Sequence, residues 1–321
     1  MKYSAESAVR WLRIMPLFLP VLAPAQAQEE GIPPRTAFKV CADPNALPES
    51  NEKEEGFENR IAKVFADDLG LALKYEWFPK RIGFIRHTLK NDETPDGSYK
   101  CDVVMGVVEG FDRADNTRPY YHSTWAMVYA KGRGLDDIRS QEDLANLPED
   151  RKKQLRIGLF DRGPATDWAF KHGLIDYMVA YSGMDADLAN YPGRIIEQDL
   201  LEDKINVTFV WGPVAGYYAR KIQKEKDQEI VVIPMQSEPG IKFDFRFAMA
   251  VRFGEKEWKQ QINDLIEKHA DDIRAILSEY NIPTVSDPLA EPYQAKADDD
   301  DDDKKRDESD RKSSGEKTDN E

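Results

Sequence analysis

Charged and aromatic side chains follow several predicted strands, and their types suit ligand binding better than bond-making chemistry. Binding a free amino acid takes an Arg that pairs with the carboxylate and an Asp that neutralises the ammonium group. Arg113 and Arg118 precede the pair Tyr120 and Tyr121, but neither has the spacing that an amino-acid-binding motif requires. Trp211 stands where the Asp would be expected. The pattern therefore argues against an amino-acid ligand.

Polar residues also lie near the ends of three other predicted strands or helices, and each group has two interpretations. Asp43 and Asn45 lie in a proline-rich loop, where they either contact a ligand or partner or cap a turn through nearby backbone. Glu58, in the first turn of a predicted helix, either faces a cleft between domains or stabilises the helix dipole. Asp161 and Arg162 precede another helix, whose first amides either hold an anion or are simply capped.

Aromatic residues gather around the same predicted strand ends. Tyr217 stands on the helix that follows Trp211, within the segment 207–220. Aromatic residues and Arg are enriched at protein interfaces, although we expect half of this set to serve core or hinge packing. We hypothesise that Arg118, Tyr120, Trp211 and Tyr217 form the surface of a cleft.

The sequence carries no motif of catalysis or of cofactor binding. A Gly-x-Ser-x-Gly elbow, a phosphate loop and a dinucleotide fingerprint are all missing. Carboxylates are abundant, but no pair is singled out by an apolar setting. The histidines are scattered singly, without metal-ligand spacing, at His87, His122, His172 and His269. We therefore expect a non-enzymatic protein with no catalytic residue, metal or cofactor.

The two cysteines, Cys41 and Cys101, allow two interpretations. An even pair often forms a disulfide in an oxidising compartment. The alternative is a pair of buried thiols in neighbouring strands, because bridging needs Cα atoms within about 7 Å. The sequence leaves both open.

The N-terminus has the features of an export signal. A basic region precedes a short apolar run at 14–24, which prolines interrupt, and residues 25–27 have the small-x-small pattern of a cleavage site. We expect cleavage near Ala27 and a periplasmic protein. A membrane span needs about 20 apolar residues, so no stable membrane anchor is expected.

The net negative charge of the chain argues against a nucleic-acid partner. The formal net charge is −15, whereas phosphate backbones require a basic surface. From residue 287 to 321 the chain has 14 acidic and 7 basic side chains, a net of −7. This segment has too few apolar residues to offset the entropy of ordering, which predicts a disordered tail. The tail either keeps the protein soluble or attracts a basic partner or a divalent cation.

Hydrophobic patterns predict an α/β fold with two lobes. Strands and helices alternate between residues 38 and 106, including a helix with Ile82, Ile85 and Leu89 inward. The same alternation returns between residues 155 and 235, and one long helix is predicted at 256–280. This alternation of strands and helices predicts a doubly wound, mostly parallel sheet in each lobe, with helices on both faces.

The order of elements predicts two hinge crossings between the lobes. Residues 1–27 are the signal peptide, and residues 28–130 and 243–285 form a discontinuous first lobe. Residues 131–242 form the second lobe, and residues 286–321 the acidic tail. Ligands of open α/β sheets bind beyond the carboxyl ends of the strands, which here lie at the cleft between the lobes.

Several ordered motifs resemble one family of periplasmic binding proteins, the MxaJ and XoxJ type associated with quinoprotein dehydrogenases. The resemblance covers about residues 38–283 and implies the type 2 periplasmic binding protein fold. Its motifs are Val-Cys-Ala-Asp-Pro-Asn-Ala-Leu-Pro (40–48), Gly-Phe-Glu-Asn-Arg-Ile-Ala (56–62), Cys-Asp-Val-Val-Met-Gly-Val (101–107), Thr-Arg-Pro-Tyr-Tyr-His-Ser-Thr (117–124) and Val-Trp-Gly-Pro-Val-Ala-Gly-Tyr-Tyr-Ala (210–219).

The resemblance implies an accessory protein of methanol oxidation. Its partner would be a PQQ-dependent methanol dehydrogenase of the XoxF or MxaF type, with the associated cytochrome c. The protein would bind the enzyme, or help it to mature, through the cleft between the lobes. The alternative function is that of a receptor which delivers a small solute other than a standard amino acid to an ABC importer.

Overall fold

The computed structural model describes residues 35–80, 82–95, 97–182 and 190–292. The predicted signal peptide and most of the acidic tail lie outside the described residues. From Thr36 onward the chain forms one unit by its internal contacts.

The first part of the sheet contains three parallel strands. In this part β1 (Ala37–Ala42) lies between β4 (Ala72–Trp77) and β5 (Val103–Val108). Helix α1 (Phe57–Leu69) buries Phe57, Ile61 and Phe65 against these strands, as its helical spacing predicts. A two-stranded sheet precedes α1 and consists of β2 (Asn45–Ala46) and β3 (Ser50–Asn51).

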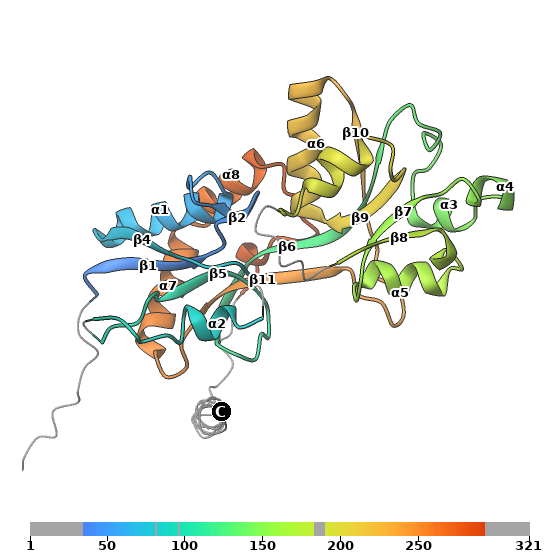
Figure 1. The fold of residues 1–321 in the computed structure, drawn as a ribbon. Helices are drawn as coiled ribbons and strands as arrows, with labels where there is room; N and C mark the ends of the chain where they lie inside the picture. Colours follow the sequence, from blue (N-terminus) through green and yellow to red (C-terminus); the bar gives the residue numbers. More distant parts are fainter. Residues whose placement is uncertain (1–34, 81, 96, 183–189, 293–321) are drawn as a thin grey trace, which may run out of the picture. The chain divides into compact units, whose positions relative to one another are not determined.

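Two long antiparallel strands carry the chain from the first part of the sheet to the second. β11 (Asp244–Val251) pairs with β5 and with the first part of β6 (Asp115–Ala130). Asp244 lies opposite Thr124, whereas the next residue of β6, Trp125, lies opposite Trp211. The hydrogen-bonded ladder is therefore continuous through β6 and β11, which run side by side in Figure 1.

The second part of the sheet is mixed. β7 (Ile157–Phe160) pairs in parallel with β8 (Met178–Tyr181) and β9 (Val207–Trp211), and β10 (Ile230–Pro234) pairs antiparallel with β6. The helical elements around it are α3 (Gln141–Ala145), α4 (Glu149–Lys152), α5 (Pro164–Lys171), the 3-10 turn η1 (Ile175–Tyr177), the π-helix η2 (Ile195–Leu200) and α6 (Gly212–Lys226).

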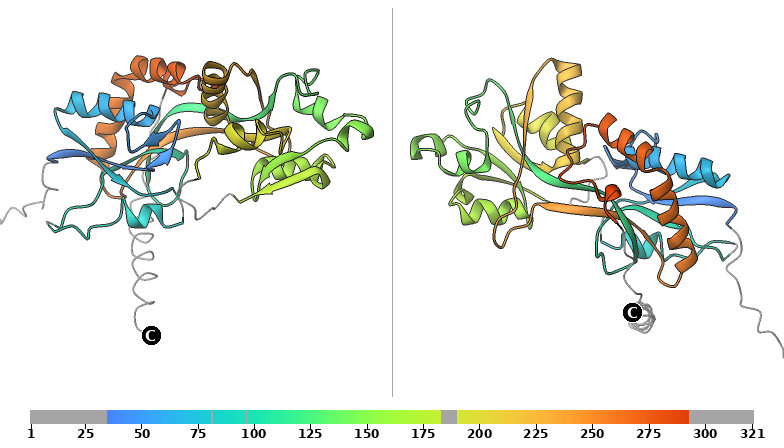
Figure 2. Two further views of the ribbon diagram at one scale, coloured as in Figure 1. Left: turned by 45° about the horizontal axis from the view of Figure 1, so that its top comes forward. Right: turned by 180° about the vertical axis from the view of Figure 1, so that it is seen from behind.

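The prediction of one long helix at 256–280 is wrong. The structure has α7 (Lys256–Lys268) and α8 (Ala270–Glu279), which meet at His269. The His269 Nδ1 lies 2.9 Å from Asp272 Oδ2, and its ring lies against Phe65 of α1. The break lets α8 pack on α1, as the views in Figure 2 show, and Ile266 and Ile273 on either side of it stay buried.

Buried residues fall into two groups on the two parts of the sheet. We call the group around β1, β5, α1, α7 and α8 the first core, and the group around β7, β9 and α6 the second core. Trp211 packs against both groups. A last 3-10 turn, η3 (Pro288–Ala290), follows α8.

The predicted inward position of Ile82 is wrong. The helix in this segment is only α2 (Phe84–His87), and it starts after Gly83, whose φ of 88° interrupts the helical pattern. Ile82 is 82% exposed, while Ile85 and Leu89 are buried. The chain turns at Gly83, so Ile82 lies before the helix and its side chain is exposed. The spacing of apolar residues does not reveal this turn.

The structure joins Cys41 and Cys101 by a disulfide, with Cα atoms 5.4 Å apart. This is the first of the two arrangements that the sequence leaves open. The bridge ties β1 to the segment that enters β5. Among the described residues, no helix combines the length and the apolarity needed to cross a bilayer.

Candidate functional site

A partly buried charge cluster lies at the carboxyl ends of β1 and β4. The Lys80 Nζ is 3.1 Å from Glu49 Oε2 and 3.4 Å from Glu58 Oε2. β1 and β4 are parallel neighbours, so their ends meet at one edge of the sheet. Lys80 follows β4, Glu49 lies in the loop that follows β1, and Glu58 stands in the first turn of α1.

Glu58 is the most deeply buried member of this cluster, with 2% of its surface exposed. Its Oε1 has no hydrogen-bond partner and lies against the backbone of Gly106 in β5. Burial raises the pKa of Glu58 to about 7, an effect that Lys80 opposes and the charge of Glu49 increases. The carboxyl group is therefore poised to change its charge near neutral pH.

Asp43 and Asn45 have structural roles in the loop that follows β1. The Asp43 Oδ1 accepts a hydrogen bond of 2.8 Å from the backbone N–H of Asn45, which caps the turn. Its Oδ2 accepts a bond of 2.6 Å from the backbone N–H of Lys80. Asp43 thus holds Lys80 beside the two glutamates, while Asn45 is exposed in β2.

Tyr120, Tyr121 and Trp211 come together near Glu58. The rings of Tyr120 and Tyr121 are 4.9 Å apart, and the charge of Glu58 acts on both phenols. Burial is the main cause that raises the pKa of each phenol well above its usual value. The two hydroxyl groups and the Trp211 indole N–H are buried without a hydrogen-bond partner.

Phe247 of β11 joins these aromatic residues. Its ring lies 4.9 Å from that of Tyr121 and 5.1 Å from that of Trp211. The series continues from Tyr121 to Phe57, from Phe57 to Tyr280 and from Tyr280 to Tyr217, with ring separations of 5.8, 6.2 and 6.1 Å. It therefore runs from the end of β9, across the first core, to α6.

The structure directs Arg118 away from this group. Arg118 is 6% exposed, and its side chain bonds Glu267 Oε2 of α7 at 3.0 Å and the Glu291 carbonyl at 3.3 Å. Its backbone N–H donates to Asn263 Oδ1 at 2.7 Å. Arg118 therefore fastens α7 to β6.

Asp161 and Arg162 stand in the turn between β7 and α5, and both are exposed. The N-cap of α5 is Gly163, with no side-chain cap hydrogen bond. The structure does not bring these two residues into the charge cluster around Lys80.

Sequence reasoning missed Lys80 and Phe247 as members of the site. Lys80 could have been found from its position just after β4. Ligands of open α/β sheets bind beyond the carboxyl ends of parallel strands, and this rule applies to β4 as it does to β1. Phe247 gave no comparable signal, because an aromatic residue inside a strand is usual in a core. Gly106 was noted only as part of a buried strand.

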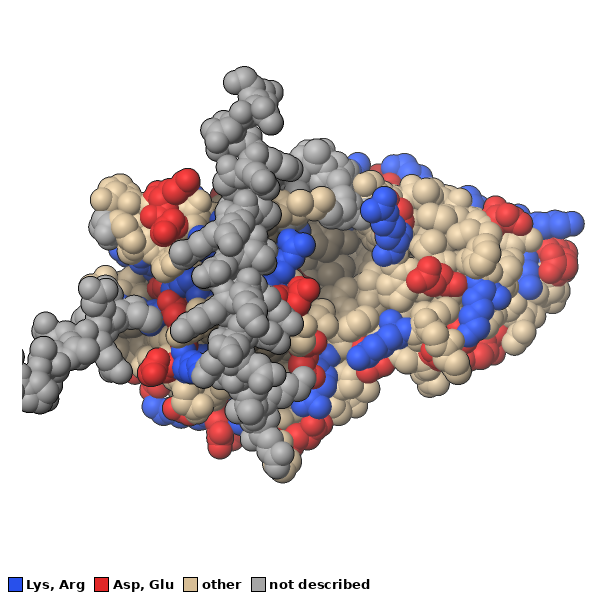
Figure 3. Space-filling model, turned by 90° about the horizontal axis from the view of Figure 1, so that it is seen from below, with Lys and Arg blue, Asp and Glu red and all other residues tan. Residues whose placement is uncertain are grey.

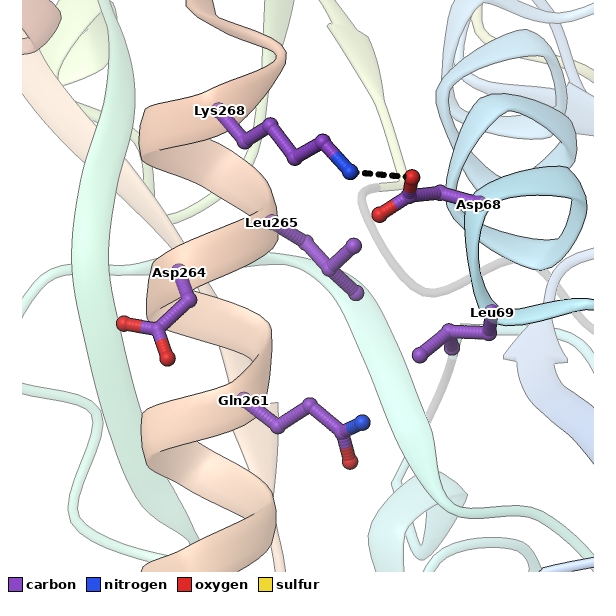
Figure 4. Close-up of a pocket in the computed structure, with 6 residues that line it drawn as sticks. All are labelled: Asp68, Leu69, Gln261, Asp264, Leu265 and Lys268. Carbon is purple, nitrogen blue, oxygen red and sulfur yellow. Dashed lines mark hydrogen bonds and ion pairs between the residues drawn. The ribbon is translucent and has the colours of Figure 1, made fainter.

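No metal cluster accompanies this arrangement among the described residues. Those residues contain no group of three or more His, Cys, Asp or Glu side chains placed to hold a metal ion. A groove of about 370 Å³ lies elsewhere, between α1 and α7, where Lys268 pairs with Asp68 (Figure 4). Figure 3 shows a hollow lined mostly by residues other than Lys, Arg, Asp and Glu. The residues described above offer aromatic faces, hydrogen-bonding groups and a carboxyl group with a pKa of about 7.

No family model matches the sequence. The chain is 26% identical to the protein MoxJ of Methylorubrum extorquens AM1 over 306 residues, which cover 88% of this chain and 96% of that protein. It is similar to the crystal structure of the periplasmic binding protein XoxJ from Methylobacterium extorquens AM1, with 31% identity and a TM-score of 0.61 over 78% of this chain and all of that one. MxaJ from Methlophaga aminisulfidivorans MPT shares the fold, with 24% identity and a TM-score of 0.63 over the same shares of the two chains. The chain therefore belongs to the family of MxaJ- and XoxJ-type periplasmic binding proteins and has their two-lobed type 2 fold.

Proposed function

We propose that this protein is a periplasmic accessory protein of a PQQ-dependent methanol dehydrogenase. It binds the dehydrogenase through the cleft between its lobes and assists its maturation or activation, and it catalyses no reaction itself. The associated cytochrome c is a second partner. Family membership supports the proposal, and the sequence motifs imply the methanol-oxidation system.

The observation that carries the proposal is the nature of the surface around Trp211. Amino-acid receptors require a charged pair for the ammonium and carboxylate groups. Here the end of β9 has an indole instead, packed on Phe247 and Phe245. Arg118, the Arg expected in the cleft, is occupied by Glu267. An aromatic residue at this position suits a polypeptide segment better than a small zwitterion.

The proposed division of the mature chain follows the crossings of β6 and β11. Residues 28–130 and 243–285 form the first lobe, residues 131–242 the second, and residues 286–321 an acidic tail. The change of partner between Thr124 and Trp125 lies within the first crossing. Export and cleavage near Ala27 place the protein in the periplasm.

The test is capture of the dehydrogenase by the exported protein from methanol-grown cells, with three variants beside the wild type. Trp211→Ala removes the ring and Trp211→Phe removes only the N–H. Phe170→Ala is the matched control, because Phe170 is an exposed aromatic residue on α5, away from the cluster.

We expect Trp211→Ala to lose capture and activation, Trp211→Phe to weaken both, and Phe170→Ala to leave both unchanged. Unchanged capture by Trp211→Ala would overturn the proposal. A thermal-shift screen of small solutes in parallel examines the importer-receptor alternative. A stabilising solute, with no dehydrogenase recovered, would favour that alternative.

A further inference from the structure

One face of α6 lies directly against the end of the C-terminal helix α8. Gly212, Gly216 and Arg220 recur every four residues, so they share one face of α6. This face contacts Glu279, Asn281 and Pro283, which end α8 and follow it. Both views in Figure 2 show α6 and α8 side by side.

The approach of the two backbones is too close for any residue with a side chain at position 216. An ideal β-carbon there would lie 2.1 Å from the carbonyl oxygen of Asn281, and one at Gly212 would lie 2.2 Å from the carbonyl oxygen of Thr124. Asn281 has a φ of 56°, and its side-chain Nδ2 donates to the Gly216 carbonyl at 3.1 Å. The contact is therefore both tight and hydrogen-bonded.

Two side chains of α6 extend the contact beyond the glycines. Tyr217 stacks on Tyr280, with ring centroids 6.1 Å apart and an interplanar angle of 18°. The Arg220 guanidinium donates to the Glu279 carbonyl at 2.6 Å. Arg220 thus meets the carbonyl end of α8, where a cation interacts favourably with the helix dipole.

The segment after Pro283 fastens the same region to the first crossing strand. The Ser123 Oγ donates to the Pro283 carbonyl at 2.5 Å, and the Val285 N–H donates to the His122 carbonyl at 2.9 Å. The His122 Nδ1 is 2.8 Å from Ser286 Oγ, and its Nε2 is 2.9 Å from Asp244 Oδ2 of β11. The chain after α8 therefore binds β6, and His122 of β6 in turn bonds β11.

We propose that these contacts form a clamp that holds α6, and the second lobe with it, at a fixed angle to the first lobe. Two crossing strands alone leave a hinge free to bend. A third connection, made of backbone packed on backbone, removes that freedom, because packed interfaces do not deform continuously. The binding surface is then preformed.

A preformed surface favours one class of ligand. A small solute is enclosed when the lobes of a binding protein close on it, whereas a polypeptide segment enters and leaves a site with immobile walls. This last step rests on the proposed function. The clamp itself rests only on the contacts of α6.

The experiment measures the distance between the lobes by pulsed electron spin resonance. Spin labels are attached at Lys63→Cys on α1 and Lys153→Cys at the end of α4, two exposed positions in a protein whose native cysteines are paired. Gly216→Ala is introduced into this background. Glu225→Ala, at an exposed position on the opposite face of α6, is the control.

We expect one narrow distance distribution for the wild type and the Glu225→Ala control, unchanged by a mixture of small solutes. Gly216→Ala should broaden or shift it. If Gly216→Ala does not fold, Arg220→Ala with Tyr217→Ala should broaden it instead. A wild-type distribution that is broad, or that shifts with the solutes, would overturn the clamp. A clamp variant that folds and keeps the wild-type distance distribution would also overturn the clamp. Dehydrogenase capture is scored separately, so the clamp and the proposed function fail independently.

Discussion

The carboxylate of Glu58 occupies the space beside Gly106 that any other residue would fill with its own β-carbon. An ideal β-carbon at position 106 would lie 2.2 Å from Glu58 Oε1 and 3.7 Å from Lys80 Nζ. The α1 helix and the β5 strand therefore fit together only because one residue has no side chain. The fit places a carboxyl group in the interior of the first lobe.

Gly106→Ala should displace the Glu58 carboxyl and destabilise the protein. Inserting a methyl group into a packed interior costs about 1–3 kcal/mol, and urea unfolding measures the loss. In a Glu58→Ala background the same substitution should cost much less, because the clashing oxygen is gone. Equal costs in both backgrounds would show that the two residues are not coupled.

The folded protein should lose stability as pH rises through the range in which Glu58 ionises. The pKa of Glu58 is about 7 in the fold, against 4.5 for a free glutamate, so the folded state binds more protons between these values. The free energy of unfolding therefore falls from pH 4.5 to pH 7, by up to about 3 kcal/mol for this group.

Glu58→Gln should remove that component of the pH dependence while keeping the shape of the side chain. Urea unfolding at pH 5 and pH 8 provides the comparison. The wild type should lose more stability than Glu58→Gln across this interval. Parallel slopes for the two proteins would contradict the assigned protonation.

Reducing the Cys41–Cys101 bridge should lower the melting temperature. The cysteines are 60 positions apart, and a loop of that length gives a chain-entropy contribution of about 4 kcal/mol. Thermal unfolding with and without dithiothreitol measures the effect. The Cys41→Ala/Cys101→Ala protein should melt early in both conditions. A wild type indifferent to complete reduction would refute the expectation.

Arg252→Leu should be strongly destabilising. Arg252 is 6% exposed and lies 2.7 Å from Asp102 Oδ1 and 2.8 Å from Glu255 Oε1. Removing it leaves two buried carboxylates without this cation, at a cost of about 3–5 kcal/mol. Lys63→Ala is the control, because its exposed pair with Asp67 contributes about 0–1 kcal/mol. Chemical unfolding of both variants should give clearly different losses.

Local sequence patterns predicted most elements of the fold. The apolar spacing of Phe57, Ile61 and Phe65 predicted α1 and its buried face, and the unbroken apolar run at 103–106 predicted a strand covered on both sides. These predictions succeed because neighbouring residues carry the period of a helix or a strand. The break at His269 and the exposure of Ile82 did not follow, because each depends on where the chain must turn to pack.

Candidate site residues were predicted in type but not in arrangement. Tyr120 and Tyr121 were expected at the surface of a cleft, but each is only 1% exposed and belongs to the first core. The binding role of these residues and of Trp211 stays a prediction. Arg118 was expected beside them and instead meets Glu267, a residue 149 positions further along the chain. No local pattern encodes such a partner.

Local patterns in the sequence predict most strands and helices, the family motifs and the replacement of an acidic residue by Trp211. Tertiary structure alone decided that Lys80 meets Glu49 and Glu58, that Glu58 fits against Gly106, and that Gly216 of α6 lies against Asn281. Elements form from interactions between near neighbours, whose spacing the chain records directly. Charges and backbones distant in the chain meet only when sheets and helices pack, and that packing depends on every element at once.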